Sequence, residues 1–358
     1  MKIHQIVAGY RKYDAISDVA NLLRDVVRSW GNGGAIYCSP GNVAPESRSG
    51  IHDLAALPRE VASDDIVVLH LSIGSPANEV FAGLKCRKAI IYHNITPPEY
   101  FDLTNRSTAA TLREGRRQMK ALAGVADLNA ADSAFNAAEL VAAGYRDVKV
   151  FPLPIDLKRF EQGAFGPKDV LFDRQGGDFN ILFVGRFAPN KRIEELVKVF
   201  YYLSKIEPRA RLFHIGAAVG MEAYSSIVTV YAEMLRLQRV HFLDVVTQES
   251  LNAAYENADA FLCMSDHEGF CAPLVEAMLH NVPVFALATS AVPETLGGAG
   301  VLFGTPPDYP VIAETIATVL NSPRLKASIL RRQAQRIAEI RSRDISAELS
   351  TLLKPLMA

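Results

Sequence analysis

Short apolar segments alternate with longer amphipathic segments along most of this chain, and the alternation predicts strands and helices in turn. The segment at 66–71, IVVLHL, is almost wholly apolar, which is typical of a strand buried on both faces. The segment at 17–29 instead repeats its apolar residues at helical spacing. A strand–helix–strand rhythm of this kind predicts a parallel sheet covered by helices.

The predicted elements form two series, separated by a glycine-rich, polar segment at 160–179 that we interpret as a linker. The first series has predicted strands at 3–8, 66–71, 89–92 and 148–153, and helices at 17–29, 106–122 and 133–143. The second has predicted strands at 181–184, 211–215, 240–242, 260–264 and 282–286, and helices at 193–205, 222–237, 248–257 and 274–280. From residue 310 on, the pattern is helical and polar.

Two α/β series in a chain of 358 residues predict two Rossmann-like domains that face each other across a cleft. We place the N-terminal domain at 1–158 and the C-terminal domain at 159–338. A last helix at 339–358 would pack back on the N-terminal domain. In open parallel sheets ligands bind beyond the carboxyl ends of the strands, so the informative residues should follow the strands.

Composition narrows the class of protein. Hydrophobic residues make up 49% and charged residues 22% of a chain with net charge −1, so it lacks the broad basic field that nucleic-acid binding needs. Its four cysteines, none in a CxxC pair, indicate a reduced, cytoplasmic protein. We find neither a signal-peptide pattern nor an apolar run long enough to span a membrane.

Several catalytic motifs are absent. The sequence has no Gly-x-Gly-x-x-Gly fingerprint, Walker A loop, His-Glu-x-x-His or Gly-x-Ser-x-Gly motif, which disfavours dehydrogenases, kinases, metalloproteases and hydrolases. It also has no Asp-x-Asp pair, the usual carboxylate pair for a metal-bound nucleotide. We therefore expect a binding site that contains no metal.

The segment EGFCAPLVE, which runs from Glu268 to Glu276, follows a predicted strand and enters a predicted helix. We expect Pro273 and Glu276 in the first helical turn, where unpaired backbone N–H groups attract phosphate. Each glutamate alone also fits a structural role, as a helix-dipole partner worth about 0.3–1 kcal/mol or as a solvated loop residue. Together, one on each side of a bound diphosphate, they could accept hydrogen bonds from sugar hydroxyls.

The segment GRFAPNKR follows another predicted strand and supplies Arg186 and Lys191. A diphosphate needs cations, and an arginine fork with a lysine would provide them without a metal. Taken alone, the same segment also fits a solvated basic loop capped by Asn190. Its place on the same sheet as the glutamate turn favours the anion-binding interpretation.

These segments together resemble a known family. FVGRFAPNKR, SDHEGFCAPLVEAM and VPETLGGAGVLF, in this order, are similar to the C-terminal domain of retaining glycosyltransferases of the GT-B fold, the family-four type or glycosyl transferases group 1. The E-x7-E spacing of Glu268 and Glu276 is the hallmark. The resemblance is strong over 180–304 and extends to the N-terminal half only in layout.

The resemblance implies a role for each matching residue. Arg186 and Lys191 would hold the donor diphosphate, Glu268 the transferred sugar and Glu276 the ribose, while His93 would face the sugar from the N-terminal domain. A histidine at a strand end also fits a polar cap. Further donor contacts, mostly through backbone, would come from Gly185, Gly269, Phe270, Cys271, Leu274 and Val275.

One segment departs from the family pattern. Many members have a glycine-rich loop after the first strand, whereas GYRKYDAISD has only Gly9 at its start. Asp14 and Ser17 are our hypothesis for an acceptor or phosphate contact there. His70, near the end of the predicted strand at 66–71, is expected to support the cleft rather than to contact substrate.

The resemblance implies a retaining, metal-independent enzyme without a cofactor. It would move a hexose from a nucleoside-diphosphate sugar to a saccharide or lipid-linked acceptor, as in bacterial cell-surface polysaccharide or glycolipid synthesis. The sequence does not determine the sugar, the base, the acceptor or the oligomeric state. Two other classes stay open: a nucleotide-sugar epimerase and a non-catalytic nucleotide-sugar-binding protein.

The predicted helix around 111–122, TLREGRRQMKAL, has a basic face. Such a face fits either an ordinary solvated helix or one that rests on the anionic inner surface of a membrane. A cytoplasmic protein, with or without peripheral membrane contact, is the expectation from this pattern.

Overall fold

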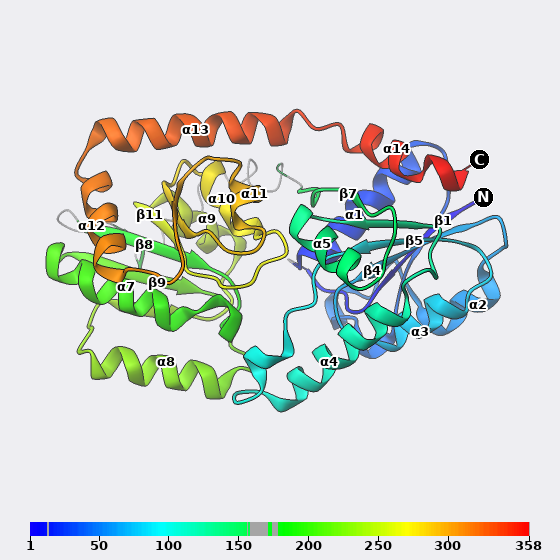
Figure 1. The fold of residues 1–358 in the computed structure, drawn as a ribbon, viewed down its shortest axis with the longest axis horizontal. Helices are drawn as coiled ribbons and strands as arrows, with labels where there is room; N and C mark the ends of the chain where they lie inside the picture. Colours follow the sequence, from blue (N-terminus) through cyan, green and yellow to red (C-terminus); the bar gives the residue numbers. More distant parts are fainter. Residues whose placement is uncertain (13, 156, 158–170, 174–177, 358) are drawn as a thin grey trace. The chain divides into compact units, whose positions relative to one another are not determined.

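The computed structural model describes residues 1–12, 14–155, 157, 171–173 and 178–357, and in this part the strands form two parallel sheets (Figure 1). The first sheet has seven strands in the order β3-β2-β1-β4-β5-β6-β7, and the second has six in the order β10-β9-β8-β11-β12-β13. Helices connect successive strands within each sheet. The α/β class predicted from the sequence is confirmed.

The first compact unit comprises 1–99, 106–156 and 343–358. Its strands are β1 Ile3–Val7, β2 Ile36–Cys38, β3 Ile51–Asp53, β4 Ile66–Leu71, β5 Arg87–Tyr92, β6 Leu128–Ala131 and β7 Lys149–Val150. Its helices are α1 Ala15–Ser29, α2 Leu57–Glu60, α3 Pro76–Gly83, α4 Arg106–Ala121, α5 Ala134–Ala142 and α14 Ile345–Met357. Helix α14 packs beside α1 (Figure 1), where Trp30 Nε1 donates to Ser346 Oγ at 2.8 Å.

The second compact unit comprises 100–105 and 157–342. Its strands are β8 Phe179–Val184, β9 Ala210–Ile215, β10 Val240–Leu243, β11 Ala260–Cys263, β12 Val284–Leu287 and β13 Val301–Phe303. Its helices are α7 Ile193–Ile206, α8 Glu222–Met234, α9 Gln248–Glu256, α10 Ala272–Leu279, α11 Val292–Leu296, α12 Tyr309–Leu320 and α13 Pro323–Arg341. Helices α7 and α12 lie side by side, and α13 packs on α10 (Figure 1).

Each sheet contains a topological switch point. The chain passes from β1 outward to β3 and then restarts on the other side of β1 with β4; in the second sheet β8 and β11 stand in the same relationship. Loops that leave two such neighbouring strands go in opposite directions and leave a crevice at the carboxyl edge. The four inner strands β1, β4, β8 and β11 are largely buried, so the cores hold these edges rigidly.

The structure corrects some predicted boundaries. The strand predicted at 148–153 is reduced to β7, because Pro152 has no N–H with which to continue the ladder. Short strands β2, β3 and β13 were not predicted, since three residues carry too little pattern. Of the predicted linker, 160–170 and 174–177 lie outside the described residues, as does the predicted domain boundary at 158 and 159.

No helix in the described part of the chain combines the length and the hydropathy that a membrane crossing requires.

Candidate functional site

Three loops of the second unit meet at the carboxyl edge of β8, β11 and β12. Asn190, after β8, donates from Nδ2 to the carbonyl of His267 at 3.0 Å and accepts from the amide of Asp266 at 2.9 Å. After β12, Ser290 Oγ accepts from the amide of Glu268 at 2.8 Å. These bonds hold the turn after β11 between its two neighbours, so the position of Glu268 is set from both sides.

Lys191 and Glu268, predicted as separate ligands of a diphosphate and a sugar, form an ion pair with each other. Lys191 Nζ lies 2.6 Å from Glu268 Oε2, and the two side chains are 21% and 7% exposed. The other carboxylate oxygen, Oε1, is buried and has no hydrogen-bond partner among the described residues. Burial alone lowers the pKa of Lys191, but the Glu268 carboxylate outweighs it, so the net pKa is raised and the lysine stays charged.

Glu276 lies on α10, but in a later turn than the sequence predicted. The helix begins at Ala272, so Glu276 is in its second turn, and no acidic residue occupies the first. The hydroxyl of buried Tyr255 donates to Glu276 Oε2 at 2.8 Å. The carboxylate is therefore held by a partner from α9 that the sequence did not reveal.

Some backbone N–H and carbonyl groups around the turn already have hydrogen-bond partners within the protein. The amide of Leu274, predicted to be free for phosphate, donates to the carbonyl of Cys271 at 3.1 Å, so that prediction was wrong for this amide. The carbonyl of Phe270 accepts from Thr295 Oγ1. Val275 is buried, while Gly269 and Phe270 are half-buried and stay the more accessible part of the turn.

At two glycines, Gly185 after β8 and Gly216 after β9, the loops after these strands approach each other closely. Gly185 donates to the carbonyl of Ile215, and its own carbonyl accepts from His214 Nε2 at 2.9 Å. A Cβ atom added to Gly216 would lie 1.9 Å from the Gly185 carbonyl oxygen, so only glycine fits there. One residue further, Arg186 is exposed, whereas Lys191 turns toward Glu268.

In the first unit, a buried chain of hydrogen bonds runs through His70, His93 and Asp132. Gln5 Oε1 lies 2.8 Å from His70 Nε2, His70 Nδ1 lies 2.9 Å from His93 Nε2, and His93 Nδ1 lies 3.3 Å from Asp132 Oδ2. Burial and the neighbouring His93 hold the pKa of His70 well below its usual value. Burial also raises the pKa of Asp132, although hydrogen bonds from His93 and Asn136 oppose the rise.

His93 thus follows β5 as predicted, but its side chain is only 2% exposed and both ring nitrogens are engaged. The residue as a whole is half-buried, so the accessible part is backbone rather than imidazole. His70 is buried and hydrogen-bonded to His93; its role in supporting the cleft stays a prediction.

Asp14 and Ser17 have local partners. Asp14 caps α1 by accepting from the amide of Ser17 at 3.0 Å and from its hydroxyl at 2.8 Å. Ser17 Oγ in turn accepts from the amide of Arg11 at 3.2 Å, and the Ser17 side chain is buried. The geometry gives both residues a role in ordering the loop after β1; a ligand contact there stays a prediction.

The basic helix α4 divides its cations between two environments. Arg116 points inward, with Nη2 at 2.7 Å from the carbonyl of Ile95 and 3.0 Å from Glu139 Oε1. Arg113, Arg117 and Lys120 are exposed at helical spacing on one face.

Three residues of these clusters were not predicted from the sequence: Asp132, Tyr255 and Ser290. Asp132 comes just after the end of β6, and that position is the signal that could have found it. Tyr255 and Ser290 had no such pattern, because their contacts depend on how α9 and the loop after β12 pack.

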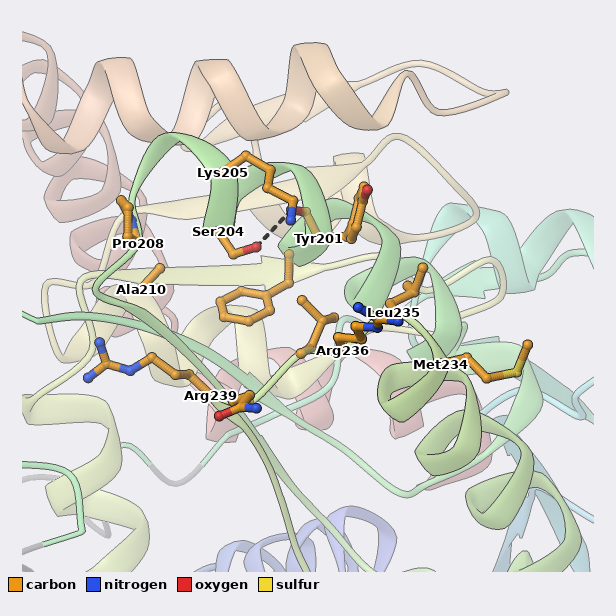
Figure 2. A pocket seen from close by; sticks show the side chains of 12 residues that line it. Tyr201, Ser204, Lys205, Pro208, Ala210, Met234, Leu235, Arg236 and Arg239 are labelled. Carbon is orange, nitrogen blue, oxygen red and sulfur yellow. Dashed lines mark hydrogen bonds between the residues drawn. The ribbon is translucent and has the colours of Figure 1, made fainter.

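A separate cavity of about 480 Å³ lies at the opposite edge of the second sheet. Its walls include Ala210 and Arg239, at the amino ends of β9 and β10, and Lys205 from the end of α7 (Figure 2). Its lining contains cations but no carboxylate, and Arg239 is already paired with Asp178 at 2.9 Å. It therefore lacks an ion pair like that of Lys191 and Glu268 at the carboxyl edge.

Comparison with known proteins gives a family match for the C-terminal half. Residues 172–338 match the family described as "Glycosyl transferases group 1". A D-inositol 3-phosphate glycosyltransferase of Nocardia farcinica is 29% identical over 176 residues, which is 48% of this chain and 39% of that protein. A GDP-mannose:cellobiosyl-diphosphopolyprenol alpha-mannosyltransferase of Xanthomonas oryzae is 28% identical over 161 residues, covering 43% of this chain and 39% of that protein. The matches thus span about two fifths of either relative.

Solved structures match over nearly the whole chain. HepE of Anabaena, in complex with UDP and glucose, has a TM-score of 0.77 at 18% identity and covers 99% of this chain and 100% of its own. The sucrose-phosphate synthase of Thermosynechococcus elongatus has a TM-score of 0.76 at 17% identity, covering 99% and 98%. At these identities the likeness shows a shared fold, the GT-B fold expected from the sequence.

Proposed function

Residues 172–338 place this chain in the family of group 1 glycosyl transferases, and from that premise we propose that it transfers a hexose from a nucleoside-diphosphate sugar to an acceptor. One observation carries the proposal. Lys191 and Glu268, from loops after neighbouring strands at a topological switch point, lie 2.6 Å apart, and one oxygen of Glu268 is left for a ligand. The acceptor in the proposal is a saccharide or a lipid-linked saccharide of cell-surface polysaccharide or glycolipid synthesis.

The chemistry follows from the charges at this edge. Lys191, with exposed Arg186 nearby in the chain, would stabilise negative charge as the diphosphate leaves, which is where electrostatic catalysis contributes most. Glu268 Oε1 would accept from a hydroxyl of the transferred sugar, and Glu276 from the ribose. With fixed cations on the leaving group, we propose transfer with retention and without a metal.

In the first unit, the proposal concerns His93 at the end of β5. His93 exposes backbone while its imidazole is held by His70 and Asp132, so these hydrogen bonds would order the end of β5. The sequence suggested that the His93 side chain faces the sugar; in this scheme His93 is instead a positioning residue.

Two nucleotide sugars should be assayed first as donor substrates. UDP-glucose is suggested by the UDP and glucose complex of HepE, and GDP-mannose by the name of the Xanthomonas relative. A thermal-shift screen with UDP, GDP and ADP, followed by their sugars, should raise the unfolding temperature for one base, since a ligand that binds only the native state stabilises it.

The decisive experiment uses the donor so identified with and without candidate acceptors. Transfer should appear as an acceptor product of unchanged anomeric configuration by NMR, in the presence of EDTA, and should fall by at least about 100-fold in Glu268→Ala. A donor converted to an isomer without any acceptor would instead establish an epimerase. Donor binding without turnover by wild-type protein, across acceptor classes, would leave a binding protein.

A further inference from the structure

Beside the ion pair, the tertiary structure assembles a cluster that the sequence spacing concealed. Cys263, at the end of β11, and Cys271, just before α10, bring their sulfur atoms together with a carboxylate oxygen of Glu268. The three donor atoms all lie within 4.8 Å of one another, and all three residues are buried. In the described part of the chain this is the one group of three such ligands that could surround an ion.

The donor set has a definite chemical preference. Two thiolates with one carboxylate suit zinc or the similar soft ion cadmium rather than magnesium or calcium, which require oxygen ligands. Ligand atoms of a tetrahedral zinc site lie roughly 3.5–4 Å apart. Small adjustments of the two thiol side chains would therefore close the cluster around one ion.

A second observation points to a ligand at this place. The Glu268 side chain is 93% buried, being 7% exposed, and its Oε1 has no hydrogen-bond partner among the described residues. A buried carboxylate oxygen left unpaired is costly, because nothing compensates the loss of its hydration. A cation would satisfy that oxygen while Oε2 keeps its bond to Lys191.

The charges of the cluster also balance around a divalent ion. Two thiolates and one carboxylate carry −3, which a divalent cation and the Lys191 ammonium together neutralise. Lys191 is close enough for this, because its Nζ lies 2.6 Å from Glu268 Oε2. Buried charge is tolerated only when it is compensated in this way.

We propose that Cys263, Glu268 and Cys271 form a binding site for a soft divalent cation of the zinc class. The site itself does not depend on the proposed transferase function. Its consequence does: because the cation and a sugar hydroxyl would use the same carboxylate, bound zinc should exclude the donor and inhibit the enzyme.

The test is a cadmium titration of the reduced, full-length chain, followed by the ultraviolet charge-transfer band of cadmium thiolates. Wild type should give a band that saturates at one ion per chain. Cys263→Ser and Cys271→Ser should each weaken binding by more than about 100-fold, since removing even a residue behind a metal ligand costs 10–100-fold. Half-buried Cys86 lies outside the cluster, so Cys86→Ser should bind like wild type.

A measurement on wild type alone avoids the risk that a variant does not fold. Zinc should protect Cys263 and Cys271, but neither Cys38 nor Cys86, from alkylation followed by peptide mass spectrometry. A cadmium band that persists in both serine variants, or zinc that protects none of the cluster cysteines, overturns the proposal. So does a disulfide between Cys263 and Cys271 that persists in reductant, because it removes the thiolates. Cadmium binding at these residues, together with no sugar transfer by the metal-free chain across the donors and acceptors tested, would sink the proposed function and leave the metal site standing.

Discussion

His70 Nδ1 lies 2.9 Å from His93 Nε2, and the planes of the two rings differ by only 8°. The direction of this bond follows from the next partner. Gln5 Nε2 donates to the carbonyl of Ala20, so Gln5 Oε1 faces His70 Nε2 and accepts a hydrogen bond from its N–H. Neutral His70 then has only an acceptor at Nδ1, and His93 must donate from Nε2.

This assignment makes a spectroscopic prediction. In ¹⁵N spectra at neutral pH, His70 should show the tautomer protonated at Nε2, and His70→Phe should leave the buried His93 donor unpaired. We expect that variant to lose about 1–3 kcal/mol of unfolding free energy. Exposed His52 is the control, and His52→Gln should change stability by less than about 0.5 kcal/mol. A His70 protonated at Nδ1 would contradict the assigned direction.

The Lys191–Glu268 pair should behave as a coupled unit. Lys191→Met and Glu268→Gln each leave one buried partner unpaired, so the double variant should be more stable than the sum of the single losses predicts. We expect a coupling energy of about 1–3 kcal/mol from a double-mutant cycle in denaturant. The solvent-exposed pair Arg117–Glu114 provides the comparison and should show much weaker coupling. Equal coupling in both cycles would mean that burial does not strengthen the inner pair.

Tyr255 should matter to ligand binding although it lies behind the site. Tyr255→Phe removes the hydroxyl that donates to Glu276 Oε2 at 2.8 Å, without changing the ring. We expect the dissociation constant of the nucleoside diphosphate to rise about twofold to twelvefold, as a lost hydrogen bond of roughly 0.5–1.5 kcal/mol implies. Calorimetric titration measures this, with Tyr202→Phe, an exposed position, as the control. Unchanged affinity would show that Glu276 does not need Tyr255 to hold a ribose.

The protein should lose stability in mild acid. Burial lowers the pKa of His214 from 6.5 to about 4, so between these values the unfolded chain binds the proton and the folded chain does not. The stabilisation is therefore complete above pH 6.5 and disappears as the pH falls through 4. At 1.36 kcal/mol per pH unit the total is roughly 3 kcal/mol.

Denaturant unfolding between pH 7 and pH 4.5 tests this slope. His214→Gln keeps a donor for the Gly185 carbonyl but cannot titrate, so its stability should fall less steeply over the same range. A variant slope as steep as that of wild type would assign the acid sensitivity to other groups, such as His70.

The exposed face of α4 tests the membrane hypothesis. If Arg113, Arg117 and Lys120 contact lipid, the chain should sediment with phosphatidylglycerol vesicles at low salt and be released at high salt. Changing Arg113 and Lys120 to glutamine should weaken binding by about 30-fold, at roughly 1 kcal/mol per charge. Inward-facing Arg116 should be left intact. No sedimentation of wild type at low salt would identify α4 as an ordinary solvated helix.

The sequence alone determined the α/β class and most elements of both sheets, because buried parallel strands and amphipathic helices leave distinct patterns of apolar residues. The strand at 66–71, for instance, was placed without error. The sequence also indicated that the loops with Lys191 and Glu268 meet at one sheet edge, because residues that follow neighbouring parallel strands gather there. Three-residue strands such as β2 carried too little pattern to be recognised.

Only the tertiary structure decided which partner each of these side chains meets. Lys191 pairs with Glu268, Tyr255 holds Glu276, and Cys271 reaches Cys263, although nothing in their spacing along the chain required it. Periodicity fixes which face of an element is buried, whereas hydrogen bonds and ligand sets depend on distances of a few ångströms between loops. Those distances are set by the packing of the core beneath the second sheet, which no local pattern encodes.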